Sequence, residues 1–236
     1  MSEIQIGLVT QAWAKNQGLT VKYLVETQST NTVAKNEAFL PECLENEFVL
    51  YLTDHQTQGR GRFDRTWSTP QKGTGLISSW SFQITEMPEP TITTLAGLAV
   101  FNAARTTWPF LNWSLKAPND LFIGDKKVAG LLVETVSQGD EYRCIIGLGF
   151  NVLAFPAEVT QATSLLRNLT VDTPLLGEDW IIFIERLFFE FSLLIPAAHE
   201  KLNSTQTAQL IFALNQNPLL TEKFQSATEL TEELWR

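Results

Sequence analysis

Three arginines and two glycines gather in one loop-like stretch, Gln56–Trp67 (QTQGRGRFDRTW), which we call the arginine loop. Glycine lets a backbone wrap closely around a ligand, and arginine offers planar donors that hold a carboxylate or phosphate through two hydrogen bonds. The 236-residue chain has a formal net charge of -9, so a local group of cations stands out. The loop therefore favours a small anionic ligand over a long nucleic acid, with a solvated basic turn as the alternative.

Lys116 is the best-placed single cation outside the loop, because it ends an expected strand just before the turn Ala117–Asp120. A lysine ammonium is a compact charge that suits one carboxylate or phosphate oxygen. In the turn, Asn119 and Asp120 could hold ribose hydroxyls or Mg²⁺. A solvated lysine and ordinary turn chemistry explain the same residues equally simply.

Ser29, Thr30 and Asn31 precede an amphipathic stretch, Thr32–Leu40, and all three are residue types that favour the start of a helix. A helix N-terminus presents free N–H groups and a positive dipole end to a ligand. Ordinary capping is the alternative interpretation.

Other reaction classes lack the residues they need. The two histidines, His55 and His199, provide neither the base of a Ser–His–Asp triad nor a metal-ligand spacing. The chain has no GxxxxGK[ST] phosphate loop and no GxGxxG fingerprint. Its two cysteines, Cys43 and Cys144, are expected to be reduced thiols. The chemistry that remains is activation of a carboxylate by a nucleotide, with cations stabilising negative charge that develops on phosphate.

Strands in the centre with helices at intervals predict a mixed α/β or α+β domain. Gly130, Gly147 and Gly149 lie inside expected strands, where a glycine is typical of close approach by a ligand, another backbone or something bulky. The expected strands are Phe48–Thr53, Thr74–Ile84, Asn112–Lys116, Leu121–Ile123, Lys127–Val136 and Tyr142–Val152, and the expected helices are Thr32–Leu40, Thr91–Trp108, Asp179–Leu194, Thr207–Asn215 and Thr221–Leu234.

The two ends of the chain are less informative. Residues 1–22 are expected to form a short strand or turn, followed by an extended segment at Tyr23–Glu26. No secretory signal and no apolar run of membrane-spanning length is present, so we expect a cytoplasmic protein without a membrane partner. We divide the chain into a catalytic domain at 1–200 and a helical tail at 201–236.

Four segments together resemble the biotin protein ligase family. They are STN at Ser29–Asn31, the arginine loop, KAPND…KVAGLLVE at Lys116–Glu134 and GLGFN at Gly147–Asn151. The resemblance implies an α+β fold, with the central mixed β-sheet and flanking helices of the class II synthetase-like biotin/lipoate ligase catalytic domain. The family usually adds a C-terminal SH3-like barrel, and we expect none here because the tail is short and helical in pattern.

The resemblance implies a two-step reaction that uses biotin, ATP and Mg²⁺. Biotin carboxylate attacks the α-phosphate of ATP, which gives biotinyl-5′-AMP and pyrophosphate. A specific lysine of a biotin carboxyl carrier protein then attacks the adenylate. No DNA-binding repressor role is expected, because no helix-turn-helix segment precedes the matched part, and a homodimer is left open.

By position, the resemblance assigns catalysis to Lys116, Arg62 and Arg60. It assigns biotin contacts to polar and small residues of three segments, namely Ser29, Thr30, Asn31, Gln56, Gly59, Arg60, Lys116, Gly130 and Leu132. It assigns nucleotide contacts to Arg62, Arg65, Trp67, Asn119 and Asn151, with Trp67 stacking near adenine.

The sequence departs from the family pattern at two places. Ala117 stands where the family has the tryptophan of KWPND, and Phe63-Asp64 replaces a basic residue and a glycine, so Asp64 would bring negative charge near the phosphates. The altered KAPND turn and the barrel that we do not expect here keep one alternative open, which is a non-catalytic protein that binds biotin or its adenylate, or docks a carrier domain. A lipoate or octanoate transferase of the same fold is another, although Cys43 lies in an expected polar loop and Cys144 lies within an expected strand.

Overall fold

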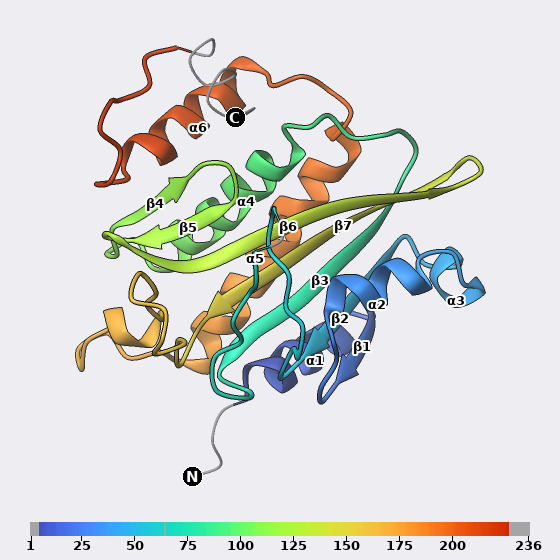
Figure 1. Cartoon of the computed structure of the whole chain (residues 1–236), viewed down its shortest axis with the longest axis horizontal. Coiled ribbons are helices and arrows are strands. Elements are labelled where there is room, and N and C mark those ends of the chain that lie inside the picture. Colours follow the sequence, from blue (N-terminus) through green and yellow to red (C-terminus); the bar gives the residue numbers. More distant parts are fainter. Residues whose placement is uncertain (1–4, 64, 227–236) are drawn as a thin grey trace.

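The computed structural model describes residues 5–63 and 65–226, which build a seven-stranded sheet with helices on both faces (Figure 1). The strand order is β1-β2-β3-β7-β6-β5-β4. β1 runs parallel to β2, and every other neighbouring pair is antiparallel. The strands are β1 (Thr20–Leu24), β2 (Phe48–Thr53), β3 (Gly75–Ile84), β4 (Trp113–Lys116), β5 (Asp120–Ile123), β6 (Lys126–Gln138) and β7 (Glu141–Asn151).

The helices divide unequally between the two faces of this sheet. α4 and α5 lie behind the sheet in Figure 1, and α2 lies in front of it. The helices are α1 (Ile6–Asn16), α2 (Thr30–Glu37), α3 (Pro41–Leu44), α4 (Ile92–Thr107), α5 (Gly177–Leu194) and α6 (Ser204–Asn215), with short 3-10 helices at Leu166–Asn168 and Ile195–Ala197. The mixed sheet and flanking helices confirm the predicted fold class.

The main core fills the space between the sheet and α1, α4, α5 and α6. Successive side chains of a strand point to opposite faces, and β2 shows the consequence. Leu50 and Leu52 join the main core, whereas Val49 and Tyr51 join a small cluster with Ala34 of α2. One face of the sheet therefore carries most of the apolar packing, and the other face is thinly covered.

The thinly covered face carries the arginine loop. The loop connects β2 to β3 and runs in front of β6 and β7 (Figure 1). Gly130 of β6 and Gly149 of β7 are register partners under it. The fold thus brings the loop, the start of α2 and the glycine-bearing strands to one face.

Most of the predicted elements are confirmed within a residue or two at each end, which is the ordinary uncertainty of element boundaries. The prediction for residues 1–22 was wrong, because Ile6–Asn16 is a helix and β1 starts at Thr20. The tail helix Ser204–Asn215 is confirmed. The second predicted tail helix is not helical over residues 221–226, and its remainder lies outside the described residues.

The tail does not stand apart from the rest of the chain. Leu210, Ala213 and Leu214 of α6 are buried in the main core. The division at residue 200 stays a prediction. Across residues 5–63 and 65–226, every helix is too short or too polar to span a bilayer.

Candidate active site

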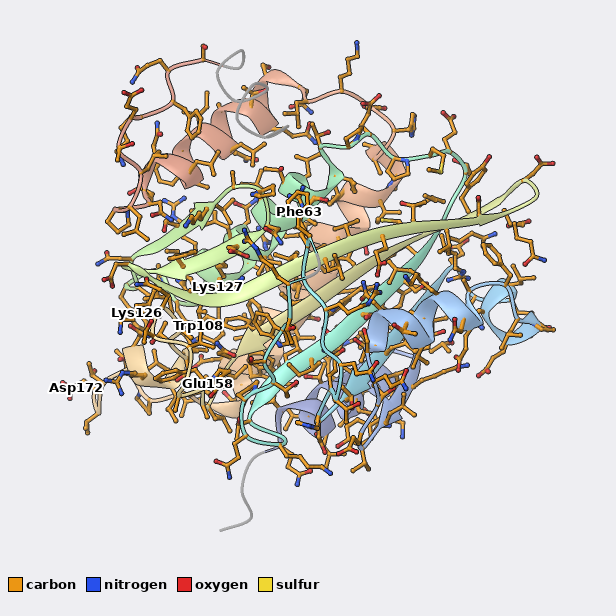
Figure 2. All side chains as sticks on the ribbon, in the orientation of Figure 1. Phe63, Trp108, Lys126, Lys127, Glu158 and Asp172 are labelled. Carbon is orange, nitrogen blue, oxygen red and sulfur yellow. The ribbon has the colours of Figure 1, made fainter. Side chains whose placement is uncertain are left out.

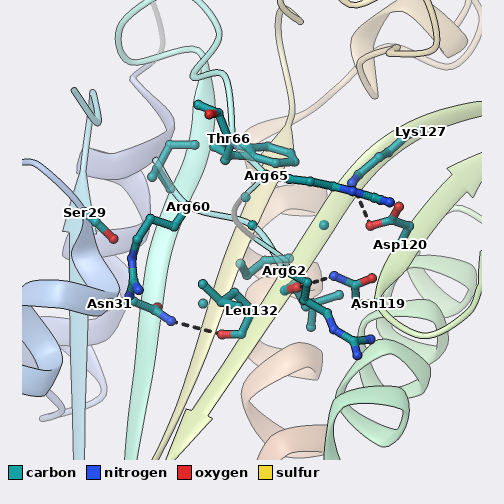
Figure 3. A pocket seen from close by; sticks show the side chains of 18 of the residues that line it. Ser29, Asn31, Arg60, Arg62, Arg65, Thr66, Asn119, Asp120, Lys127 and Leu132 are labelled. Atoms are coloured by element: carbon teal, nitrogen blue, oxygen red, sulfur yellow. Dashed lines mark hydrogen bonds and ion pairs between the residues drawn. The ribbon is translucent and has the colours of Figure 1, made fainter. Parts of the chain in front are cut away.

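A cavity of about 460 Å³ lies on the thinly covered face, between the start of α2, the arginine loop and the strands below (Figure 3). Its size is within the range of small-molecule sites. Among the predicted site residues, those that line it are Ser29, Thr30, Asn31, Gln56, Arg60, Arg62, Arg65, Trp67, Lys116, Asn119, Gly130 and Leu132. Segments that are far apart in the sequence thus meet at one cavity.

Gly59 and Asn151 do not line this cavity. The carbonyl of Gly59 accepts a hydrogen bond from Trp67 N–H at 2.9 Å, and a Cβ on Gly59 would lie 2.4 Å from the Trp67 carbonyl oxygen. This glycine is needed where the loop closes on itself. The buried Asn151 donates from Nδ2 to the Thr163 carbonyl at 3.1 Å. The ligand contacts assigned to these two residues stay predictions.

The STN segment does not cap α2 with its own side chains. The helix begins at Thr30, and Ser29 makes no side-chain capping bond. Instead, the Thr30 backbone N–H donates to Gln56 Oε1 at 2.8 Å, and the Thr30 hydroxyl donates to the same oxygen at 3.2 Å. The helix start was predicted correctly, but its acceptor comes from the arginine loop and ties the loop to α2.

Asn31 is bonded on every side within the protein. Its Oδ1 accepts from the Ser79 hydroxyl, and its Nδ2 donates to the Leu132 carbonyl at 3.0 Å and to Glu134 Oε2 at 2.9 Å. The side chain is buried. Asn31 therefore holds α2 on β3 and β6, and its amide is already occupied.

The glycines of β6 and β7 make room for the chain's own side chains. A Cβ on Gly149 would lie 2.3 Å from Trp67 Cε2, and one on Gly147 would lie 2.4 Å from Asn31 Oδ1. At distances under 3 Å the neighbouring group must shift, so a side chain at either position would displace Trp67 or Asn31. A close approach is found at both glycines, but the approaching groups are an indole ring and an amide side chain of this chain, where a ligand or another backbone was expected.

The cations of the site differ in what they contact. Arg60 Nη2 lies 2.7 Å from Glu134 Oε2, and Lys127 Nζ lies 2.6 Å from Asp120 Oδ1. Arg65 extends toward Asp120 and Lys127 in Figure 3. Among the described residues, Arg62, Arg65 and Lys116 have no carboxylate in an ion pair. Within the described part of the chain, these three positive charges at the cavity are therefore not compensated by an ion pair.

Phe63 stands out in the arginine loop by its backbone conformation and its exposure. It has a backbone φ of 52°, which is uncommon for a side chain of its size. Figure 2 shows it at the tip of the arginine loop, where its ring is 72% exposed. The Arg62 guanidinium lies 4.8 Å from the ring centroid. The neighbouring Asp64 lies outside the described residues, so its effect on bound phosphates stays a prediction.

Sequence reasoning missed Glu134 as a site residue. Its Oε1 accepts from Lys35 Nζ at 2.7 Å, besides the contacts of Oε2 with Arg60 and Asn31. Burial raises the pKa of the Glu134 carboxyl, but the hydrogen bonds from Lys35 and Asn31 and the charge of Arg60 outweigh burial and lower the pKa overall. The available signal was strand periodicity, because Gly130, Leu132 and Glu134 alternate onto one face of β6.

The cavity is lined by hydroxyls, amides and cations and lies over a mixed sheet. Residues 23–151, more than half of the chain, match the model of the biotin/lipoate A/B protein ligase family. The chain belongs to this family.

Curated relatives show the same relationship. The chain is 35% identical over 173 residues to the bifunctional ligase/repressor BirA of Bacillus subtilis, covering 70% of this chain and 50% of that protein. It is 31% identical over 131 residues to the biotin–[acetyl-CoA-carboxylase] ligase of Mycobacterium tuberculosis, covering 53% of this chain and 47% of that protein. The chain thus spans about half the length of these two relatives.

The fold is also found among solved structures. The biotin protein ligase from Aquifex aeolicus in complex with biotin and ATP superposes with a TM-score of 0.59 at 24% sequence identity, covering 80% of this chain and 78% of that chain. At this level of identity, the likeness shows the fold alone.

Proposed function

We propose that the protein is an ATP-dependent biotin–protein ligase, which activates biotin to biotinyl-5′-AMP and transfers it to a lysine of a biotin carboxyl carrier protein. The observation that carries this proposal is the polarity of the cavity. Neutral hydrogen-bonding groups from Ser29, Thr30 and Gln56 gather at the start of α2, and the cations Arg62 and Lys116 line the same cavity. A molecule with a neutral polar ring and a carboxylate fits this arrangement.

The neutral side suits the ring system of biotin. Ser29 and Thr30 are buried at the start of α2, where backbone N–H groups and hydroxyls are close together. Gly130 and Leu132 of β6 form part of the wall. Hydroxyls and amides can hold the ureido group, while the apolar wall contacts the hydrocarbon part.

The cationic side suits the first chemical step. As the biotin carboxylate oxygen attacks the α-phosphorus of ATP and pyrophosphate leaves, negative charge grows on the phosphate oxygens. Lys116 and Arg62 can stabilise that charge without rearrangement, because no carboxylate among the described residues holds them. Arg65, Trp67 and Asn119 line the remaining space and are the proposed nucleotide contacts.

Mg²⁺ would enter with ATP as part of the substrate. Such an ion is held mainly by phosphate oxygens, with one or two carboxylates from the protein. Asp120 is a carboxylate on the cavity wall, where it pairs with Lys127. The described residues form no cluster of three metal-ligating side chains.

In the second step, the ε-amine of the carrier lysine attacks the acyl carbon of biotinyl-5′-AMP. An amide bond forms, AMP leaves, and the lysine nitrogen loses its proton. Cations that held the phosphate during activation also stabilise the AMP leaving group. No covalent nucleophile of the protein is needed.

A cysteine-based acyl transfer finds no support at this site. Cys43 and Cys144 are both buried, and neither lines the cavity. Burial raises the pKa of the Cys144 thiol to about 12, so this group stays protonated near neutral pH. A transferase that forms a thioester would need an accessible thiolate beside its ligand.

The proposal is tested by incubating the protein with biotin, MgATP and a biotin carboxyl carrier domain, and measuring the carrier's mass. The expected product carries one biotin on its acceptor lysine, and a carrier in which that lysine is replaced by arginine stays unmodified. Biotin binding without any transfer would contradict the proposal and favour the binding-protein alternative.

A further inference from the structure

Glu134 joins three separate parts of the site through one carboxylate. Lys35 and Asn31 of α2 contact it at 2.7 and 2.9 Å, and Arg60 of the arginine loop contacts it at 2.7 Å. Glu134 itself belongs to β6, two residues after Leu132 in the cavity wall. Its side chain is only 21% exposed, so its negative charge depends on these partners.

Three contacts hold the arginine loop against the rest of the chain. At its start, Gln56 accepts the hydrogen bond from Thr30. At its end, the Trp67 ring lies on Gly149. Between these points, the ion pair of Arg60 with Glu134 ties the loop to β6. Of the three loop arginines, Arg60 is the one whose charge is compensated by a described carboxylate.

We infer that Glu134 is a positioning residue that latches the arginine loop over the cavity through Arg60, and that this latch sets how long the bound adenylate is retained. Arg60 then acts through Glu134 and holds the loop, leaving Arg62 and Arg65 to face the ligand. The adenylate part of the inference rests on the proposed function. The loop latch rests on the contacts alone.

Limited trypsin digestion tests the latch without any substrate, because the loop carries its own cleavage sites. Cleavage after Arg62 and Arg65 needs the loop backbone to enter the protease in an extended form, so it should be faster when the loop is held less firmly. Glu134→Gln removes the charge but keeps the size of the side chain and an acceptor for Asn31. We expect these two cleavages to become roughly three- to tenfold faster in this variant, the range expected for a partly buried, hydrogen-bonded ion pair.

Glu141→Gln is the matched control. Glu141 lies on the neighbouring strand β7, is exposed, and accepts a hydrogen bond from Gln83 at 3.0 Å far from the loop. The loop of the Glu141→Gln variant should be cleaved at the same rate as that of the unaltered protein. Raising the salt concentration should speed loop cleavage in the unaltered protein and have little effect on Glu134→Gln, because salt screens the partly exposed pair. Equal cleavage of Glu134→Gln and the unaltered protein would overturn the latch.

Release of preformed biotinyl-5′-AMP tests the second part. Glu134→Gln, Arg60→Gln and the double variant should all release it faster by a similar factor, since the two side chains act as one pair. The pairing would be overturned if the fold-increases in release rate of the two single variants multiplied in the double variant. If the unaltered protein forms no adenylate, the proposed function fails, while the digestion experiment still decides the latch.

Discussion

The cations of the site fall into two groups that the sequence does not distinguish. Arg60 and Lys127 pair with the carboxylates of Glu134 and Asp120, whereas Lys116 and Arg62 pair with none of the described carboxylates. In a chain of net charge -9, cations left unpaired beside a cavity favour an anionic ligand. Charge that develops during a reaction is stabilised best by groups already in place.

Lys116→Ala should lower the rate of adenylate formation by about 100-fold or more, the scale of losing one preorganised charge-stabilising group. Biotin binding should survive in part, because the neutral side of the cavity is unchanged. Lys126→Ala is the control, since Lys126 is exposed on the nearby β5–β6 hairpin and does not line the cavity (Figure 2). Adenylate formation by Lys116→Ala within a few-fold of the unaltered protein would refute this role.

The contribution of Glu134 should depend on pH in a definite direction. Lys35, Arg60 and Asn31 face the carboxylate and lower its pKa in the folded protein. The charged form therefore adds stability above the pKa of the unfolded chain, and this stability is lost as pH falls through the lower pKa of the folded chain. The difference in thermal midpoint between the unaltered protein and Glu134→Gln should shrink as pH is lowered from neutral into this acid range. A difference that stays constant with pH would contradict the assignment.

At the scale of elements, local sequence patterns predicted helices and strands correctly wherever a single local signal was clear. The apolar run Phe48–Thr53 predicted β2 to the residue, and glycines in β6 and β7 predicted a close approach. Helix α1 was missed because its buried face includes Thr10, which looks solvated until Trp180 Nε1 is seen to donate to its hydroxyl at 3.1 Å. That partner lies 170 residues away, so no local window contains the reason.

The contacts of the STN segment could not be predicted from local sequence, because its partners also come from distant parts of the chain. Composition placed the helix start correctly, but Gln56 and Glu134 come from a loop and a strand whose positions depend on the sheet order. Glu134 was within reach of the period-2 pattern of β6, which puts it on the face of Gly130 and Leu132. The contact of Arg60 with Glu134 could not be predicted in this way, because the arginine loop has no periodic structure.

Gly149→Ala should displace the Trp67 ring from the sheet. The added Cβ would lie 2.3 Å from the ring, so either Trp67 or the strand must move. We expect a loss of about 1–3 kcal/mol in the free energy of unfolding, typical of overpacking, together with faster tryptic cleavage of the arginine loop. Gly177→Ala is the control, because a Cβ there meets nothing within 4 Å. Unchanged stability and cleavage in Gly149→Ala would contradict the assigned contact.

At the scale of the whole molecule, the two faces of the sheet have different tasks. The helix-covered face supplies a large apolar core, and the other face leaves space for a cavity under one loop. The sheet can then hold residues from α2, β4 and β6 in fixed relation beneath the loop. α6 belongs to the supporting side through Leu210, Ala213 and Leu214.

Leu210→Ala tests whether the tail is part of the same cooperative unit. Leu210 is fully buried in the main core, so we expect the free energy of unfolding of the whole protein to fall by about 2–5 kcal/mol in one denaturant transition. Leu219→Ala, at a half-exposed position, should change it by less than about 0.5 kcal/mol. A separate early transition for the tail would instead support an independent segment after residue 200.

The most direct test of the proposed function is biotin-dependent exchange of labelled pyrophosphate into ATP, measured on the purified protein with Mg²⁺. This exchange reports the reversible formation of biotinyl-5′-AMP and needs no carrier protein. The cavity described above predicts exchange that requires biotin and disappears in Lys116→Ala. No exchange, with biotin binding intact by calorimetry, would contradict the account and identify a protein that binds biotin without activating it.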